Sequence, residues 1–124
     1  MEGRPRACCP RCGHALCEAA LTLAERSHAA AIIAVTQAGH TARMLAALRP
    51  AARIIAATPN ARTAAALSLV WGVSPVVTDQ ASLATVRDLL VARNLVPSGS
   101  VVVFVAISAG LGGDGVNFVH VERL

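Results

Sequence analysis

The sequence contains no lysine and no tyrosine, and aromatic residues make up only 2% of it. The formal net charge of +4 is therefore carried by arginine alone. A nucleic-acid-binding surface would gather its basic residues on one face, preferably with aromatic residues between them. The arginines here are scattered along the chain. This distribution argues against a nucleic-acid partner and suits a mildly basic domain that meets small anions.

A long hydrophobic run is also missing, because no stretch approaches the roughly 20 apolar residues of a membrane-spanning helix. The most apolar stretch, Val101 to Leu111, predicts a buried strand. No apolar segment with a cleavage site follows the early arginines, so we expect no secretory signal, no membrane partner and a cytoplasmic location. With 124 residues, of which 55% are hydrophobic, the chain can form one folded domain.

Helical and strand patterns alternate along this domain. Alternation of this kind predicts an α/β fold with a mostly parallel sheet and helices on both faces, a three-layer α/β/α sandwich. The last two strands are too close in sequence for a crossover helix, so we expect the fifth strand to be antiparallel. We expect helices at 15–30, 41–48, 62–70 and 82–95, and strands at 32–36, 53–58, 73–78, 100–107 and 117–121.

One short pattern occurs twice. The stretch AIIAVTQAGHTARML, residues 31–45, returns as RIIAATPNARTAAAL at residues 53–67. Each copy holds an apolar strand, a threonine, a polar loop and the start of a helix. The repeat is therefore the strand–helix unit of a parallel sheet, used twice in succession.

A ligand site is expected where the strand order reverses, outside the carboxyl ends of the strands. With a strand order of 3-2-1-4, the loops that follow strands one and four meet there. The first loop enters a helix directly, and the N–H groups of a helix N-terminus favour an anion such as phosphate. The candidate phosphate-binding residues are Thr36, Gln37, Ala38, Gly39, His40 and Thr41, with Gly110, Gly112, Gly113 and Gly115 in the second loop.

These residues belong to stretches that resemble a known family. AERSHAAAIIAVTQAGHTARMLAALRP, IIAATPNARTAAALSLVWGVSPVVTD, GSVVVFVAISAG and VNFVHV are similar, in this order, to the C-terminal domain of bacterial pyruvate kinases. The similarity extends from about Ala15 to Val121. It implies a sheet of order 3-2-1-4-5 with strand five antiparallel.

The resemblance also implies a regulatory role rather than catalysis. In this family a separate barrel holds the substrates, magnesium and potassium, so this chain itself would need no cofactor. The C-terminal domain of many members binds an activator such as fructose 1,6-bisphosphate, with the 36–41 loop around a phosphate. Subunits of the family also pair, which implies a homo-oligomer or a separate pyruvate kinase barrel chain as partner.

The chain departs from the family at the expected site. Ala38 stands where the family often has serine, His40 stands where it often has lysine or arginine, and the second loop is shorter. These changes favour a monophosphate, or no ligand, over a bisphosphate. Two other interpretations stay open: a small enzyme acting on a phosphorylated substrate in the same crevice, and a relic without function.

The first residues lie outside the resemblance. We expect a cysteine-rich tail over 1–14, followed by the domain at 15–124. Zinc usually takes two pairs of ligands separated by a longer loop. Four ligands within about ten residues would be strained, so we predict no metal site, although Cys9, Cys12, His14 and Cys17 have suitable side chains. Trp71 is expected either in the core or packed at a helix end.

Overall fold

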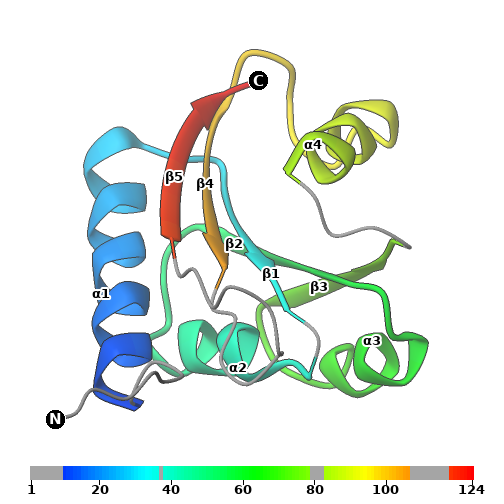
Figure 1. Ribbon diagram of the computed structural model, residues 1–124. Coiled ribbons are helices and arrows are strands. Elements are labelled where there is room, and N and C mark those ends of the chain that lie inside the picture. The colour runs from blue at the N-terminus through cyan, green and yellow to red at the C-terminus, as the bar shows by residue number, and fades with distance from the viewer. Residues whose placement is uncertain (1–9, 37, 79–82, 107–117) are drawn as a thin grey trace, which may run out of the picture.

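The computed structural model describes residues 10–36, 38–78, 83–106 and 118–124. These residues form an α/β domain around a five-stranded sheet (Figure 1). The elements are α1 (Pro10–Ser27), β1 (Ala31–Val35), α2 (His40–Ala47), β2 (Arg53–Thr58), α3 (Ala61–Leu67), β3 (Val73–Val77), α4 (Leu83–Ala92), β4 (Val101–Ala106) and β5 (Phe118–Arg123).

The strand order is β3-β2-β1-β4-β5, which confirms the expected topology. β1 lies in the centre and pairs in parallel with β2 and β4, so that Ile32 stands opposite Ile54 and Val103. β5 runs antiparallel to β4, with His120 opposite Phe104. The strand order reverses between β1 and β4, and the crevice at their carboxyl ends is the place where open α/β sheets bind ligands.

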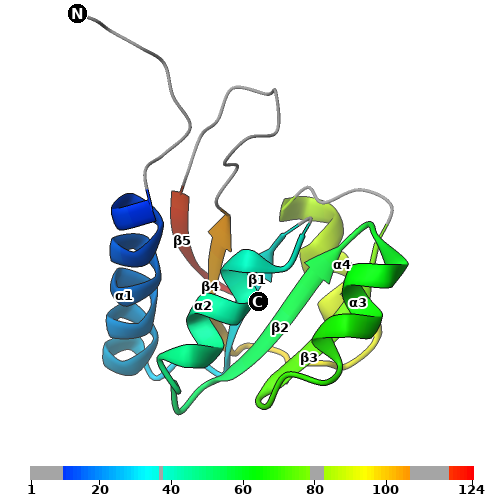
Figure 2. The same cartoon turned by 90° about the horizontal axis from the view of Figure 1, so that it is seen from below.

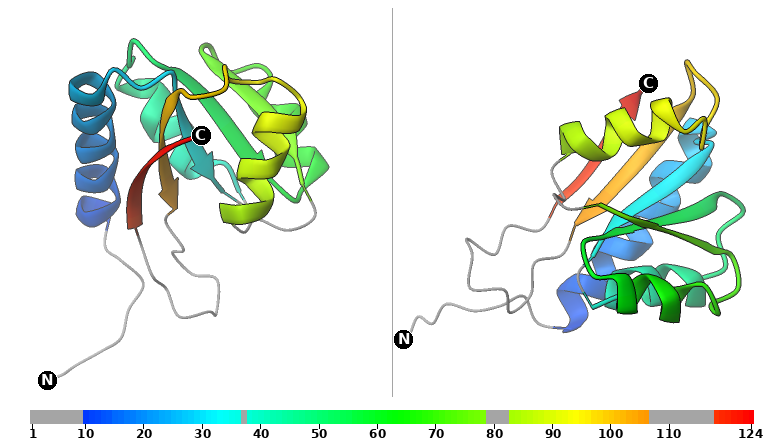
Figure 3. Two further views of the ribbon diagram at one scale, coloured as in Figure 1. Left: turned by 90° about the horizontal axis from the view of Figure 1, so that it is seen from above. Right: turned by 90° about the vertical axis from the view of Figure 1, so that its right-hand side faces the viewer.

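Helices cover both faces of the sheet, as expected for a three-layer sandwich. α1, α2 and α3 lie along one face (Figure 2). α4 lies on the opposite side of the sheet from α2 and α3 (Figure 3). The connections that contain α2 and α3 each join neighbouring parallel strands, whereas the connection through α4 carries the chain from one edge of the sheet past its centre.

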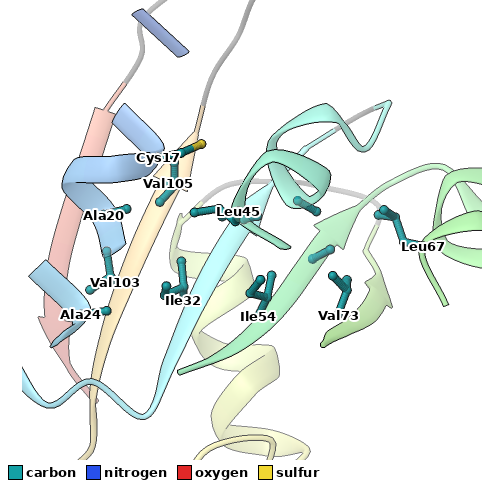
Figure 4. Close-up of a cluster of buried hydrophobic side chains, with 13 residues drawn as sticks. Cys17, Ala20, Ala24, Ile32, Leu45, Ile54, Leu67, Val73, Val103 and Val105 are labelled. Carbon is teal, nitrogen blue, oxygen red and sulfur yellow. The ribbon is translucent and has the colours of Figure 1, made fainter. Parts of the chain in front are cut away.

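The larger core lies under α1, α2 and α3 (Figure 4). Cys17, Ala20 and Ala24 form a helical stripe on α1, and their small side chains let the helix approach Val103 and Val105 closely. Burial of each large aliphatic side chain here contributes roughly 1.5 to 3 kcal/mol. The remaining buried members are Ile32, Ala34, Ala42, Leu45, Ile54, Ala56, Leu67 and Val73.

A second core joins α4 to the other face of the sheet. Val86 and Leu90 of α4 pack in one cluster with Ile33, Ile55 and Phe104. Because the central strands are buried on both faces, they are almost continuously apolar, as the sequence pattern indicated. An ion pair of 2.8 Å between Arg87 Nη1 and Glu122 Oε2 also connects α4 with β5.

Several helix ends differ from expectation. α1 begins at Pro10 rather than Ala15, because proline suits the first turn of a helix, where its missing N–H is not needed. α3 ends at Leu67, and a turn with hydrogen bonds from Leu69 N and Val70 N continues toward residue 70. α4 ends at Ala92 and is followed by Asn94 with a left-handed φ of 53°. Among the described helices, none has the length and hydropathy needed to cross a membrane.

Candidate functional site

Thr36 and Gly39 hold the loop after β1 in a fixed turn. The Thr36 hydroxyl oxygen accepts a hydrogen bond of 2.9 Å from the Gly39 N–H. Thr36 also extends the parallel ladder by one residue, since its N–H donates to the Ala57 carbonyl at 2.9 Å. Gly39 is buried and has a φ of 94°, a conformation that favours glycine. The loop therefore delivers the chain to α2 in one defined geometry.

α2 begins at His40, and its N-terminus has no side-chain cap. Gly39 occupies the cap position without a side-chain hydrogen bond, and its carbonyl accepts from Arg43 N at 3.0 Å. Thr41 is only 3% exposed. Within the described part of the chain, no group forms a hydrogen bond with the Thr41 hydroxyl. A buried hydroxyl without a partner is costly, and side chains in a helix lean toward the helix N-terminus.

The equivalent position in the second strand–helix unit is built differently. The Asn60 side chain accepts hydrogen bonds from Arg62 N at 2.9 Å and from Thr63 N at 3.4 Å. The Thr58 hydroxyl accepts from Asn60 N at 3.2 Å, just as Thr36 accepts from Gly39. α3 therefore caps its own N-terminus, whereas α2 leaves its N-terminus to water or to a ligand. Of the two repeats, only the first leaves its helix N-terminus without a side-chain cap.

The buried polar side chains of the described residues are all threonines, and all lie at the carboxyl edge of the sheet. Thr58 is the last residue of β2, Thr36 and Thr78 directly follow β1 and β3, and Thr41 lies in the first turn of α2. The parallel pairing of β2 with β3 continues to this edge of the sheet, because Thr78 N donates to Thr58 O at 2.9 Å. The matching of Thr36 with Thr58 was visible in the sequence repeat. The burial of Thr78, which also follows an apolar strand, was not.

The charges near this edge are positive. His40 and Arg43 are exposed on the first turn of α2, and Arg62 is exposed on the first turn of α3. Neither α2 nor α3 contains an acidic residue. A helix N-terminus and cations nearby favour a bound anion.

The structure places only part of the predicted site. Ala38 is exposed between Thr36 and the buried Gly39, so the described residues of the first loop do lie together at the start of α2. Gln37 falls outside the described residues. So does the whole second loop with Gly110, Gly112, Gly113 and Gly115.

The cysteine-rich start shows no ligand set in the described residues. Cys17 is buried in the core under α1, and this burial raises the pKa of its thiol to about 11. His14 is exposed, with Nε2 3.3 Å from Glu18 Oε2. Among the residues described, no three histidine, cysteine, aspartate or glutamate side chains gather in a way that could hold a metal ion. Cys9 lies outside the described residues.

Two surface pockets lie at the opposite end of the sheet. One has a volume of about 410 Å³ and is lined by the end of α1 and by Pro50, Ala51 and Ala52. The other, of about 170 Å³, shares these three residues and reaches Trp71. Trp71 is 76% exposed, with the Arg49 guanidinium 5.5 Å from its ring centroid. The expectation of a core position for Trp71 is therefore wrong, and its place after a helix end is correct.

The described groups of the carboxyl edge are mainly hydrogen-bond donors. They are threonine hydroxyls, helix N–H groups, an imidazole and guanidinium groups, all of which can donate hydrogen bonds to a phosphate. Nucleophilic catalysis needs an activated nucleophile beside a base, and the described residues of this edge offer no such pair. Fold and site together define a doubly wound α/β domain with an uncapped helix N-terminus at its switch point.

Comparison with known proteins places this domain in a family. The family model described as the pyruvate kinase alpha/beta domain matches residues 14–122, and the chain belongs to this family. Pyruvate kinase of Staphylococcus saprophyticus is 55% identical over 47 residues, which are 38% of this chain and 8% of that protein. Pyruvate kinase of Clostridium acetobutylicum is 44% identical over 59 residues, 48% of this chain and 12% of that protein.

Solved structures of pyruvate kinase support the same family assignment. Pyruvate kinase of Cryptosporidium parvum, determined in complex with ADP, has a TM-score of 0.76 and 26% sequence identity, and the match covers 98% of this chain. That match covers 25% of the Cryptosporidium chain. The present chain thus spans about a quarter of the solved enzyme, and the aligned segments are a still smaller share of the curated relatives.

Proposed function

We propose that this domain binds the phosphate group of a small phosphorylated metabolite at the 36–41 loop, and that it regulates rather than catalyses. The observation that carries the proposal is the buried Thr41 hydroxyl, which has no hydrogen-bond partner among the described residues. A phosphate oxygen at the start of α2 would satisfy this hydroxyl and the N–H groups of the first turn. The uncapped Gly39 and the positive charges nearby support the same interpretation.

A phosphomonoester suits the described residues better than a bisphosphate. Of the two described helices that begin at this edge with an assigned N-cap, α2 alone has no side-chain cap, so one helix N-terminus is open to a phosphate. Fructose 1,6-bisphosphate stays in the set of candidate ligands because the family resemblance suggests it. We expect the domain itself to need no metal or other cofactor.

The proposed partners follow from the length of the relatives. Because the chain spans 25% of a solved pyruvate kinase, a regulatory role would be exerted on a catalytic barrel supplied by a separate chain or within a homo-oligomer. We propose a cytoplasmic location with the same partners.

The test is a thermal-shift series with the full chain against fructose 1,6-bisphosphate, ribose 5-phosphate, glucose 6-phosphate and AMP. A ligand at about 100 times its Kd adds roughly 2.7 kcal/mol to the free energy of unfolding, which raises Tm by several degrees. We expect a shift with at least one of them, and its loss in Thr41→Val.

The matched control is Asn60→Ala, which removes the cap of the neighbouring helix. It lowers Tm without ligand but leaves the ligand-induced shift intact, because the Asn60 side chain bonds to Arg62 N and Thr63 N within α3 itself. If no phosphorylated compound shifts Tm, or if both variants lose the shift equally, the proposed function is wrong. Turnover of any of these compounds would instead favour the small-enzyme interpretation.

A further inference from the structure

We propose that Arg49, Leu69 and Trp71 form a docking surface for a protein segment in which carboxylates stand beside apolar side chains. These three residues are called the Trp71 surface below. Arg49 precedes β2 and Trp71 precedes β3, so the surface lies at the end of the sheet opposite the 36–41 loop. The inference therefore does not depend on a ligand at that loop.

The Trp71 surface holds the two most exposed large apolar side chains in the described part of the chain. Leu69 is 87% exposed and Trp71 is 76% exposed, whereas the next, Val91, is 47% exposed. Single apolar residues scattered over a surface are ordinary, but two large ones on the same turn form a patch that contact with another protein would cover. Tryptophan and arginine are also enriched in protein interfaces.

The turn that carries Leu69 and Trp71 is held in place by hydrogen bonds. Leu69 N donates to the Ala66 carbonyl at 3.2 Å, and Val70 N donates to the Leu67 carbonyl at 3.0 Å. Val70, between the two exposed side chains, packs against the larger core. A surface that is already ordered loses little conformational entropy when a partner binds.

The charge of the Trp71 surface is positive and has no counter-charge within the domain. The Arg49 guanidinium lies 5.5 Å from the Trp71 ring centroid, and α2 and α3, which these residues follow, lie side by side (Figure 2). Arg49 and Arg53 line one pocket with Trp71. In the part of the chain that the structure describes, neither arginine is paired with a carboxylate. The sequence from residue 29 to residue 78 contains no aspartate or glutamate.

These charges select the occupant. A carboxylate of a partner can accept two parallel hydrogen bonds from a guanidinium, while an apolar side chain beside it covers Leu69. A second copy of the chain, docked through the same surface, would bring two cationic patches together. A nucleic acid needs a continuous basic track, and Arg43 and Arg62 lie in the first turns of α2 and α3, at the other edge of the sheet.

The experiment is a titration of the full chain with a synthetic peptide of aspartate and leucine residues. Trp71 is the single tryptophan, so its fluorescence reports binding directly. We expect a saturable change in emission. A peptide with lysine in place of aspartate, and one with serine in place of leucine, should each bind roughly tenfold more weakly.

Variants locate the binding on the surface. Arg49→Gln and Leu69→Ser should each weaken binding of the acidic peptide by about fivefold or more. The matched controls are Arg62→Gln, which removes an exposed arginine at the other edge, and Val91→Ser, which removes an exposed apolar side chain on α4. Both controls should bind the peptide as the wild type does.

Three results would overturn the inference: no binding of the acidic peptide, equal binding of the lysine peptide, or an equal loss of affinity in the control variants. A DNA duplex that changes the Trp71 emission at lower concentration than the peptide would make a nucleic acid the occupant instead. Sedimentation velocity tests the remaining occupant, because self-association that Leu69→Ser abolishes would assign the surface to a second copy. Failure of every phosphorylated compound at the 36–41 loop would leave these results unchanged.

Discussion

A Cβ atom added to Gly39 would lie 3.3 Å from Cδ2 of Leu67 and 3.4 Å from Cγ2 of Thr63. The loop that opens α2 is therefore pressed against the face of α3, the next helix along the sheet. The proposed phosphate site is shaped by the neighbouring repeat as well as by its own residues.

Gly39→Ala is expected to destabilise the domain more than Gly99→Ala does. Both glycines have a positive φ, 94° and 85°, so alanine costs about 1 kcal/mol of backbone strain at either position. An added Cβ at Gly99 meets nothing within 4 Å, whereas at Gly39 it crowds Leu67. We expect a further loss of about 1 kcal/mol at Gly39 from this crowding. Urea unfolding of both variants checks the difference, and equal losses would show that Leu67 yields freely.

Two threonines of the proposed site differ in the role that we expect for their hydroxyl groups: Thr36 stabilises the fold, and Thr41 binds the ligand. Thr36→Val removes the acceptor of the Gly39 N–H, and the free energy of unfolding should fall by about 1 to 2 kcal/mol. Thr41→Val replaces a hydroxyl that has no partner among the described residues, so stability should stay the same or rise slightly. Thermal unfolding without ligand measures both. A loss in Thr41→Val as large as in Thr36→Val would mean that the hydroxyl is needed for folding.

Much of this architecture could be predicted from residue patterns. The apolar runs of β1, β2 and β4 are buried on both faces, and this makes central parallel strands recognisable in a sequence. The repeat of Ile32 and Ile33 as Ile54 and Ile55 marked the two equivalent units. The antiparallel course of β5 followed from the short connection before it. These features depend on local periodicity and on chain length, which a single sequence contains.

The details of the site depended on contacts between repeats, which periodicity does not show. Gly39 and Asn60 are the N-cap residues of α2 and α3, and only the folded structure shows that the Asn60 side chain caps its helix while α2 has no side-chain cap. The exposure of Trp71 was equally hidden. A large aromatic residue is usually assigned to the core, and here Arg49 stacks on it from the end of α2.

The contribution of the contact between Arg49 and Trp71 to stability can be measured with His28 as a control. Arg49 and His28 both follow a helix with a left-handed φ, 51° and 54°. Glycine relieves this strain, so His28→Gly should raise the free energy of unfolding by about 0.5 to 1 kcal/mol. Arg49→Gly gains the same relief but loses a cation–π contact worth about 0.5 to 1 kcal/mol, and its net change should be near zero.

Chemical denaturation gives both values, and Trp71 is the single tryptophan of the chain, so its fluorescence reports on the stack directly. We expect the emission of the folded state to change in Arg49→Gly and to stay the same in His28→Gly. Equal stabilisation by both variants would show that the stack contributes nothing to folding.

The buried thiol of Cys17 predicts how stability responds to alkaline pH. Desolvation raises its pKa from an ordinary value of 9.0 to about 11. In the unfolded chain the thiol loses its proton above its ordinary pKa, while in the folded chain it keeps the proton until the raised value is reached. The stability is therefore fully present below about pH 9 and is lost as the pH rises toward about pH 11, by on the order of 2 kcal/mol.

The composition makes this loss easy to assign. Lysine and tyrosine normally titrate in the same range, and the chain has neither, which leaves cysteine as the side chain that changes charge there. A background with Cys8, Cys9 and Cys12 changed to serine isolates Cys17, and Cys17→Ala in that background is the control. We expect urea midpoints to fall between about pH 9 and pH 11 in the background protein and to stay level in the control. Parallel decline in both proteins would mean that Cys17 does not govern the alkaline response, and rapid reaction of Cys17 with a thiol reagent in the folded state would contradict its burial.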